Sequence, residues 1–83
     1  MEMITLYNII PKGDGYHELC RNRETGELEK WHRGFKRPPH LVELLFESEQ
    51  EAQAWLSENG LSEQYAPQIM WMNKDYYAPT TNF

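Results

Sequence analysis

One segment carries the signals of an α-helix, and its shortness limits what the chain can fold into. Ser48 and Glu51 are spaced as an S-x-x-E capping box, in which each side chain satisfies a backbone N–H of the other residue. The apolar residues that follow share one helical face: Ala52, Trp55 and Leu56. Asn59-Gly60-Leu61 is typical of a left-handed C-cap, so the sequence predicts one helix of about ten residues.

The other elements are predicted to be strands, because they are short, rich in β-branched and aromatic residues, and separated by turns. They cover residues 3–10, 16–22, 28–33, 41–46 and 68–73. A hairpin turn at 24–27 joins the second strand to the third, and the Pro38-Pro39 pair interrupts any ladder before the fourth. The prediction is an α+β fold in one domain, 1–83, in the order β-β-β-β-α-β, with 74–83 as a possible extended tail. Its sheet is small and antiparallel-dominated, with four to five strands and the helix packed on one face.

Three of these predicted strands are apolar on both faces. In 3–10, Leu6 and Ile10 alternate with Tyr7 and Ile9, and strands 41–46 and 68–73 have a similar pattern. Since one helix covers only one face, the second face needs another cover. The loop with two prolines, the C-terminal tail, a second copy of the chain or a different protein could each supply it.

The cysteine and histidine content argues against several classes of site. Cys20 is the only cysteine, so the chain forms no internal disulfide and no thiolate metal cluster. His17, His32 and His40 lack the tight spacing of metal ligands, and we expect no metal and no cofactor. Neither a signal peptide nor a membrane span is recognisable, and the cytoplasm is therefore the expected compartment.

The charged residues are unevenly distributed along the chain, whose net charge is −5. Residues 21–37 contain six basic and three acidic side chains, whereas residues 43–63 contain six Glu and no Lys or Arg. Such a distribution predicts a bipolar molecule that is steered toward charged partners.

The acidic segment and the aromatic C-terminus predict a non-enzymatic protein that binds another protein. The expected anionic contacts are Glu51, Glu58 and Glu63, whose carboxylates could pair with arginines that normally hold phosphates. The expected anchors are Trp71, Tyr76 and Tyr77, with Phe83 nearby, because aromatic side chains dominate binding hot spots. Simpler explanations are a helix dipole satisfied by glutamates and a tail that packs on the open sheet face.

In size, acidity and low helix content, the chain resembles small inhibitors encoded by phages and mobile elements, including anti-CRISPR and other anti-defence proteins. The resemblance involves no shared motif and transfers no residues. It implies a partner that is a nucleic-acid-binding complex, whose surface this protein would occupy. A homodimer is a further possibility, because a second copy would also cover the open face.

Two alternative functions use the basic part of the chain. A nucleic-acid-binding module would use the segment in which aromatic and basic residues alternate: Trp31, Arg33, Phe35, Lys36 and Arg37. The net negative charge disfavours such direct binding. A small metal-independent ribonuclease would need a base, an acid and a phosphate clamp, drawn from His17, His32, Glu18, Glu29, Arg33 and Tyr residues.

Overall fold

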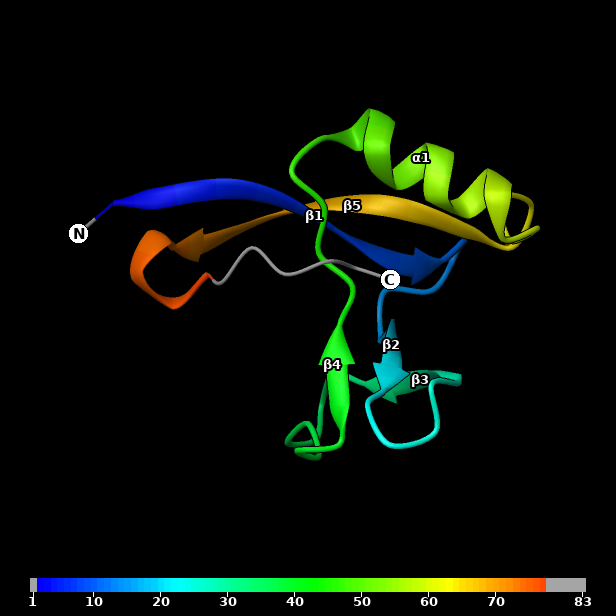
Figure 1. The fold of residues 1–83 in the computed structure, drawn as a ribbon, viewed down its shortest axis with the longest axis horizontal. Helices are drawn as coiled ribbons and strands as arrows, with labels where there is room; N and C mark the ends of the chain where they lie inside the picture. The colour runs from blue at the N-terminus through cyan, green and yellow to red at the C-terminus, as the bar shows by residue number, and fades with distance from the viewer. Residues whose placement is uncertain (1, 78–83) are drawn as a thin grey trace.

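The computed structural model describes residues 2–77, which form five strands, one α-helix and a short 3₁₀ helix (Figure 1). The strands are β1 (Met3–Pro11), β2 (His17–Asn22), β3 (Leu28–His32), β4 (Leu41–Glu43) and β5 (Tyr65–Asn73). The helices are α1 (Glu49–Glu58) and the 3₁₀ helix η1 (Lys74–Tyr76). The α+β class and the order β-β-β-β-α-β are as predicted. None of the helices formed by these residues is long and apolar enough to cross a membrane.

The strands divide into two antiparallel sheets, where we expected one. β1 pairs with β5 in a two-stranded ribbon, and β2 lies between β3 and β4 in the second sheet. The turn after β1 directs the chain away from the ribbon, with Gly13 at φ 75° and the Asp14 carboxylate accepting the Tyr16 N–H. As a result β2 and β4 run crosswise to the ribbon, on the side away from α1 (Figure 1).

The last strand begins earlier than expected, at Tyr65, because its first residues pair with the end of β1. Pro67 lies in this added part, opposite Ile9. Proline is tolerated at this position because β5 is an edge strand, and no strand within residues 2–77 pairs along its outer edge. Strand β4 is correspondingly shorter than expected and ends at Glu43.

Helix α1 is capped at the residues that its sequence predicts, and the structure shows one of the two bonds of the predicted capping box. The Ser48 hydroxyl accepts the Glu51 N–H at 3.1 Å at the start of the helix. At the other end Gly60 has φ 68°, and the Leu61 N–H donates to the Leu56 carbonyl at 2.9 Å. This bond is the long bond of a Schellman motif, and it requires a residue such as glycine that tolerates a positive φ.

The hydrophobic core lies where α1 meets the ribbon and β2. It consists of buried apolar residues from all of these elements and from the segment that leads into the helix: Ile9, Leu19, Leu44, Phe46, Ala52, Trp55 and Leu56. The segment before α1 also bridges to β1, because Phe46 and Tyr7 exchange two backbone hydrogen bonds of 2.9 Å. The helix therefore begins beside the middle of the ribbon and extends along only one half of it (Figure 1).

The opposite face of the ribbon, for which the sequence left several covers open, is partly covered by the chain's own three-stranded sheet. Leu6 and Asn8 on that face are buried, and Ile10 and Met70 are half-buried. Part of the cover is polar, since the Arg33 guanidinium from the end of β3 donates to the Gln68 side chain of β5. The exposed apolar residues of the ribbon instead lie on the face that carries the helix.

Candidate functional site

An apolar strip is exposed on the helix-bearing face of the ribbon, beyond the N-terminal end of α1. Met3, Ile69 and Trp71 are 54%, 47% and 61% exposed. Trp71 pairs with Thr5 across the ribbon, and Met3 pairs with Asn73, so the three apolar side chains are near neighbours on one face. We call Met3, Ile69 and Trp71 the ribbon strip. Three large apolar side chains exposed together on a monomer are typical of an interaction surface.

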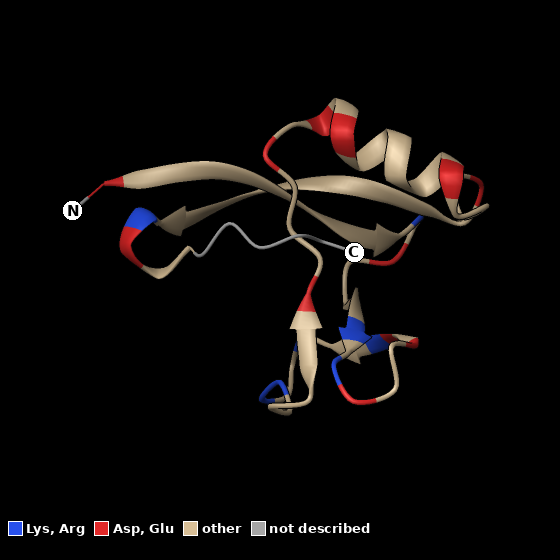
Figure 2. Cartoon of the chain, viewed as in Figure 1, with Lys and Arg blue, Asp and Glu red and all other residues tan. Residues whose placement is uncertain are grey.

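The acidic side chains of α1 are divided between the two ends of the helix. Ser48 caps the helix two residues after the Phe46 bridge to Tyr7, and Tyr7 pairs with Ile69 of the ribbon strip. The first turn, with Glu49 and Glu51, therefore begins beside the ribbon strip. Glu58 and Glu63 lie at the other end of the helix, near the start of β5. Six strand residues, a length of about 20 Å, separate the start of β5 from Trp71. Figure 2 shows these acidic groups along α1 and its flanks.

The two predicted tyrosine anchors have different environments. Tyr76 in η1 is exposed, whereas Tyr77 is half-buried and its hydroxyl donates to the Glu47 carboxylate at 3.1 Å. Burial, and then Glu47, raise the pKa of Tyr77. Tyr77 thus attaches the chain after η1 to the segment before α1. Phe83 lies outside the described residues.

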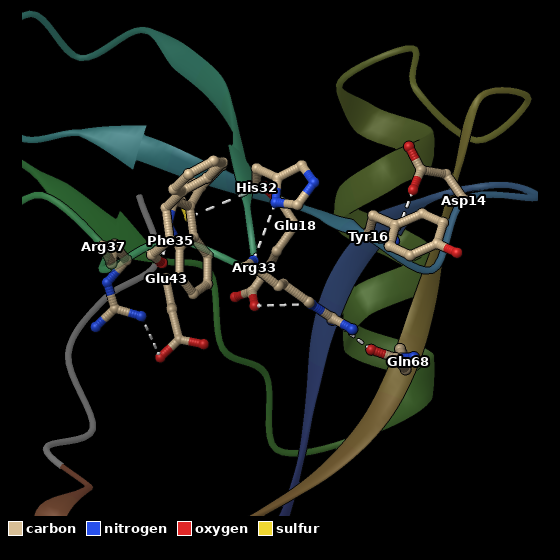
Figure 3. A network of polar contacts seen from close by, with 12 residues as sticks. Asp14, Tyr16, Glu18, His32, Arg33, Phe35, Arg37, Glu43 and Gln68 are labelled. Atoms are coloured by element: carbon tan, nitrogen blue, oxygen red, sulfur yellow. Dashed lines mark hydrogen bonds and ion pairs between the residues drawn. The ribbon is translucent and has the colours of Figure 1, made fainter.

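The predicted nucleic-acid residues do not form one exposed row. Trp31 is half-buried, donates its indole N–H to the Phe35 carbonyl at 3.1 Å, and lies under the Arg37 guanidinium at 5.6 Å. Arg33 turns inward toward Glu18 and Gln68 (Figure 3). Two residues of the set, Phe35 and Lys36, are exposed.

A buried acidic pair lies behind this segment, at the junction of the two sheets. Glu18 on β2 is 2% exposed and faces Glu43 on β4, and the Arg37 guanidinium binds the Glu43 carboxylate at 2.9 Å. Burial, and then the hydrogen bond and repulsion from Glu43, raise the pKa of Glu18 to about 8 despite Arg33 at 3.7 Å. Oε2 of Glu18 is buried and has no hydrogen-bond partner among residues 2–77. The raised pKa of Glu18 favours its protonated form and so lowers the negative charge that the two arginines face.

The structure brings together a row of rings that sequence reasoning missed. Tyr16 stacks on His32 at 6.3 Å between ring centroids, and Phe35 contacts His32 at 5.1 Å. Tyr16 and Phe35 are 71% and 70% exposed. Gly34 makes this packing possible, because a Cβ there would lie 3.0 Å from the His32 ring. We call Tyr16, His32 and Phe35 the ring row. The hairpin register, which pairs His17 with His32, was the available signal.

The ribonuclease set is only partly assembled. His17 and His32 contact each other edge to face at 5.0 Å, and Asp14 holds Nδ1 of His17 at 2.8 Å. Glu18 is buried on the opposite face of the sheet. Glu29 also lies on that face, opposite Cys20, and accepts a hydrogen bond from Asn22. Neither carboxylate can act with the two histidines.

The other hollows of the described residues include an open one of ≈ 380 Å³ lined by Arg23, Glu24, Pro39 and His40. Within residues 2–77, no three His, Cys, Asp or Glu side chains are placed to hold a metal ion. Cys20 is fully buried, and its burial raises the pKa of the thiol to about 12. A hollow of ≈ 170 Å³ lined by Leu19, Leu28, Lys30, Leu61 and Tyr65 is smaller than the usual pocket for a small-molecule ligand.

Comparison of the chain with protein-family models, with curated proteins and with solved structures found no match. The protein presents two candidate functional surfaces, the ribbon strip beside α1 and the ring row on the three-stranded sheet.

Proposed function

We propose that this protein acts without catalysis, by binding a nucleic-acid-binding protein through the ribbon strip and the first turn of α1. The observation that carries the proposal is the exposure of Met3, Ile69 and Trp71 side by side on one face. Trp71 would serve as the central anchor, because a large rigid side chain that is already exposed gains apolar burial on binding.

Charge determines the kind of partner. Glu49 and Glu51 begin the helix beside the strip, and neither forms an ion pair with any residue of 2–77. Carboxylates next to an apolar anchor complement a surface where Lys and Arg surround an apolar pocket. Surfaces that bind phosphates supply these cations, so occupancy by this protein would exclude nucleic acid from them. Such competition is the mode of action expected of a small anti-defence inhibitor, and the cytoplasm is the expected compartment.

Affinity capture with matched variants tests the proposal. Tagged protein would be incubated with nuclease-treated extract of the native host, and the bound proteins would be quantified by mass spectrometry. We expect a nucleic-acid-binding protein that is lost with Trp71→Ala and with the double change Glu49→Lys and Glu51→Lys. The double change Glu58→Lys and Glu63→Lys makes the same charge reversal at the far end of α1 and should preserve capture.

Three outcomes would overturn the proposal. Equal loss with both charge reversals would mean that net charge, rather than the strip, drives capture. A captured protein that Trp71→Ala retains would remove the anchor. Light scattering that gives twice the monomer mass, abolished by Trp71→Ala, would identify a second copy of the chain as the occupant of the strip.

A further inference from the structure

We propose that the ring row binds single-stranded nucleic acid, with Tyr16, His32 and Phe35 as a stacking platform for unpaired bases. This surface belongs to the three-stranded sheet, on the side of the ribbon away from α1, and the proposal does not depend on the ribbon strip (Figure 1). Stacking on aromatic side chains tolerates any base, so it suits a surface without a deep pocket.

The ring row is held in place by backbone contacts. The Arg33 N–H donates to the Tyr16 carbonyl at 2.8 Å, and the Phe35 N–H donates to the His32 carbonyl at 3.1 Å. The Trp31 indole N–H also donates a hydrogen bond to the Phe35 carbonyl. Rings fixed before binding lose little conformational entropy when a base stacks on them. Figure 3 shows the three rings close together at the end of the hairpin.

The two histidines add hydrogen-bonding groups with different roles. The Gly34 N–H donates to Nδ1 of His32 at 3.0 Å, so the neutral ring carries its proton on Nε2 and can donate. Nδ1 of His17 binds the Asp14 carboxylate at 2.8 Å, so that Nε2 of the neutral ring can accept. A donor and an acceptor therefore lie beside the stacking surface, where the edge of a splayed base would lie.

The charges around the ring row are mixed, with the Asp14 carboxylate beside Tyr16 and a cation next to Phe35. Lys36 is exposed next to Phe35, and Arg33 and Arg37 flank the same loop. The Arg33 and Arg37 side chains pair with Glu18 and Glu43 on the opposite face of the sheet, so Lys36 is the exposed cation of this loop that forms no ion pair within residues 2–77. Figure 2 shows Lys and Arg together with Asp and Glu on this sheet and its loops, whereas α1 carries acidic residues and no Lys or Arg. Local positive charge can attract a strand even though the whole chain carries −5.

Fluorescence anisotropy with a labelled twelve-nucleotide oligouridine tests the proposal directly. The full chain should bind it, and a duplex of the same length should bind at least about tenfold more weakly, because paired bases cannot reach the rings. Phe35→Ala should weaken binding about five- to one-hundredfold, whereas Phe35→Trp should preserve it. Lys36→Glu should weaken binding and lower the slope of log K against log salt by about one.

Tyr76→Ala is the matched control, since it removes an exposed aromatic ring outside the ring row. Three results would overturn the proposal: no binding at low salt, equal binding of duplex, or equal affinities for the parent and Phe35→Ala. Folding of Phe35→Ala is checked by circular dichroism, and Tyr16→Ala provides an independent second variant. If the parent cleaves the RNA oligonucleotide and His17→Ala and His32→Ala do not, the ring row is part of a ribonuclease site and not a binding platform.

Discussion

The carboxyl groups of Glu18 and Glu43 meet across β2 and β4, where the two sheets join, and the pair holds a proton that an exposed glutamate would have lost. The pKa of Glu18 is raised from 4.5 to about 8, so the folded protein binds this proton more tightly than the unfolded chain does. Below pH 4.5 the group is protonated in both states. Between pH 4.5 and 8 the unfolded chain releases the proton first, and the free energy of unfolding therefore falls as pH rises.

Glu18→Gln should remove most of this pH dependence. The amide cannot ionise, yet it can still donate a hydrogen bond to Glu43. Above pH 8 the variant should therefore be more stable than the parent by at least about 1.4 kcal/mol, the free energy of one pKa unit. Urea unfolding at a series of pH values measures this, with the exposed Glu49→Gln as control. Parallel pH profiles for the parent and Glu18→Gln would contradict the raised pKa.

Cys20 should be unreactive until the protein unfolds. Its thiol is fully buried, and with a pKa of about 12 almost none of it is thiolate at pH 8. A colorimetric disulfide reagent at pH 8 should modify the denatured protein at once. It should modify the native protein only as fast as unfolding exposes the Cys20 thiol. Rapid modification of the native protein would show that β2 is more accessible than the structure indicates.

Truncation to alanine should destabilise the protein strongly at Leu56 and hardly at all at Trp71. Leu56→Ala removes a fully buried side chain from the core and should cost about 2 to 5 kcal/mol of stability. Trp71→Ala removes a larger but exposed side chain and should change stability by no more than about 0.5 kcal/mol. Thermal unfolding compares the two. A large loss with Trp71→Ala would mean that the ribbon strip is structural rather than free for a partner.

Features that depend on neighbouring residues were predictable from the sequence. The caps at Ser48 and Gly60 involve bonds that span a few residues, and both are present as predicted. The turn between β2 and β3 is also local, and counting outward from the Arg21–Leu28 pair already places His17 opposite His32. An interaction can be predicted from the sequence wherever both of its partners lie in one short stretch of the chain.

The division into two sheets and the location of the ribbon strip were not predictable. β1 pairs with a strand at the far end of the chain, and Pro67 made the start of that strand resemble a loop. Alternation shows that Ile69 and Trp71 share a face, but it cannot show how far along that face α1 extends. The ring row depends on the packing of His32 against Gly34, which no periodic pattern reveals.

Replacement by alanine should lower stability at the C-cap glycine, Gly60, but not at Gly15. Gly60 has φ 68°, whereas Gly15 has no positive φ, and a Cβ would meet open space at either position. Gly60→Ala should cost about 1 kcal/mol through backbone strain alone. Gly15→Ala should be close to neutral. Denaturant unfolding of both variants separates strain from crowding, and equal effects would contradict the left-handed cap.

The proline in β5 has a consequence for assembly. Pro67 has no N–H, so it interrupts the row of backbone donors along the outer edge of the strand. A strand added from another molecule could form an unbroken ladder only beyond this point, along Ile69 to Asn73. That stretch also carries Trp71, so main-chain pairing and aromatic burial would occur together. Such β-augmentation would set the direction and register of an incoming peptide before any of its side chains is recognised.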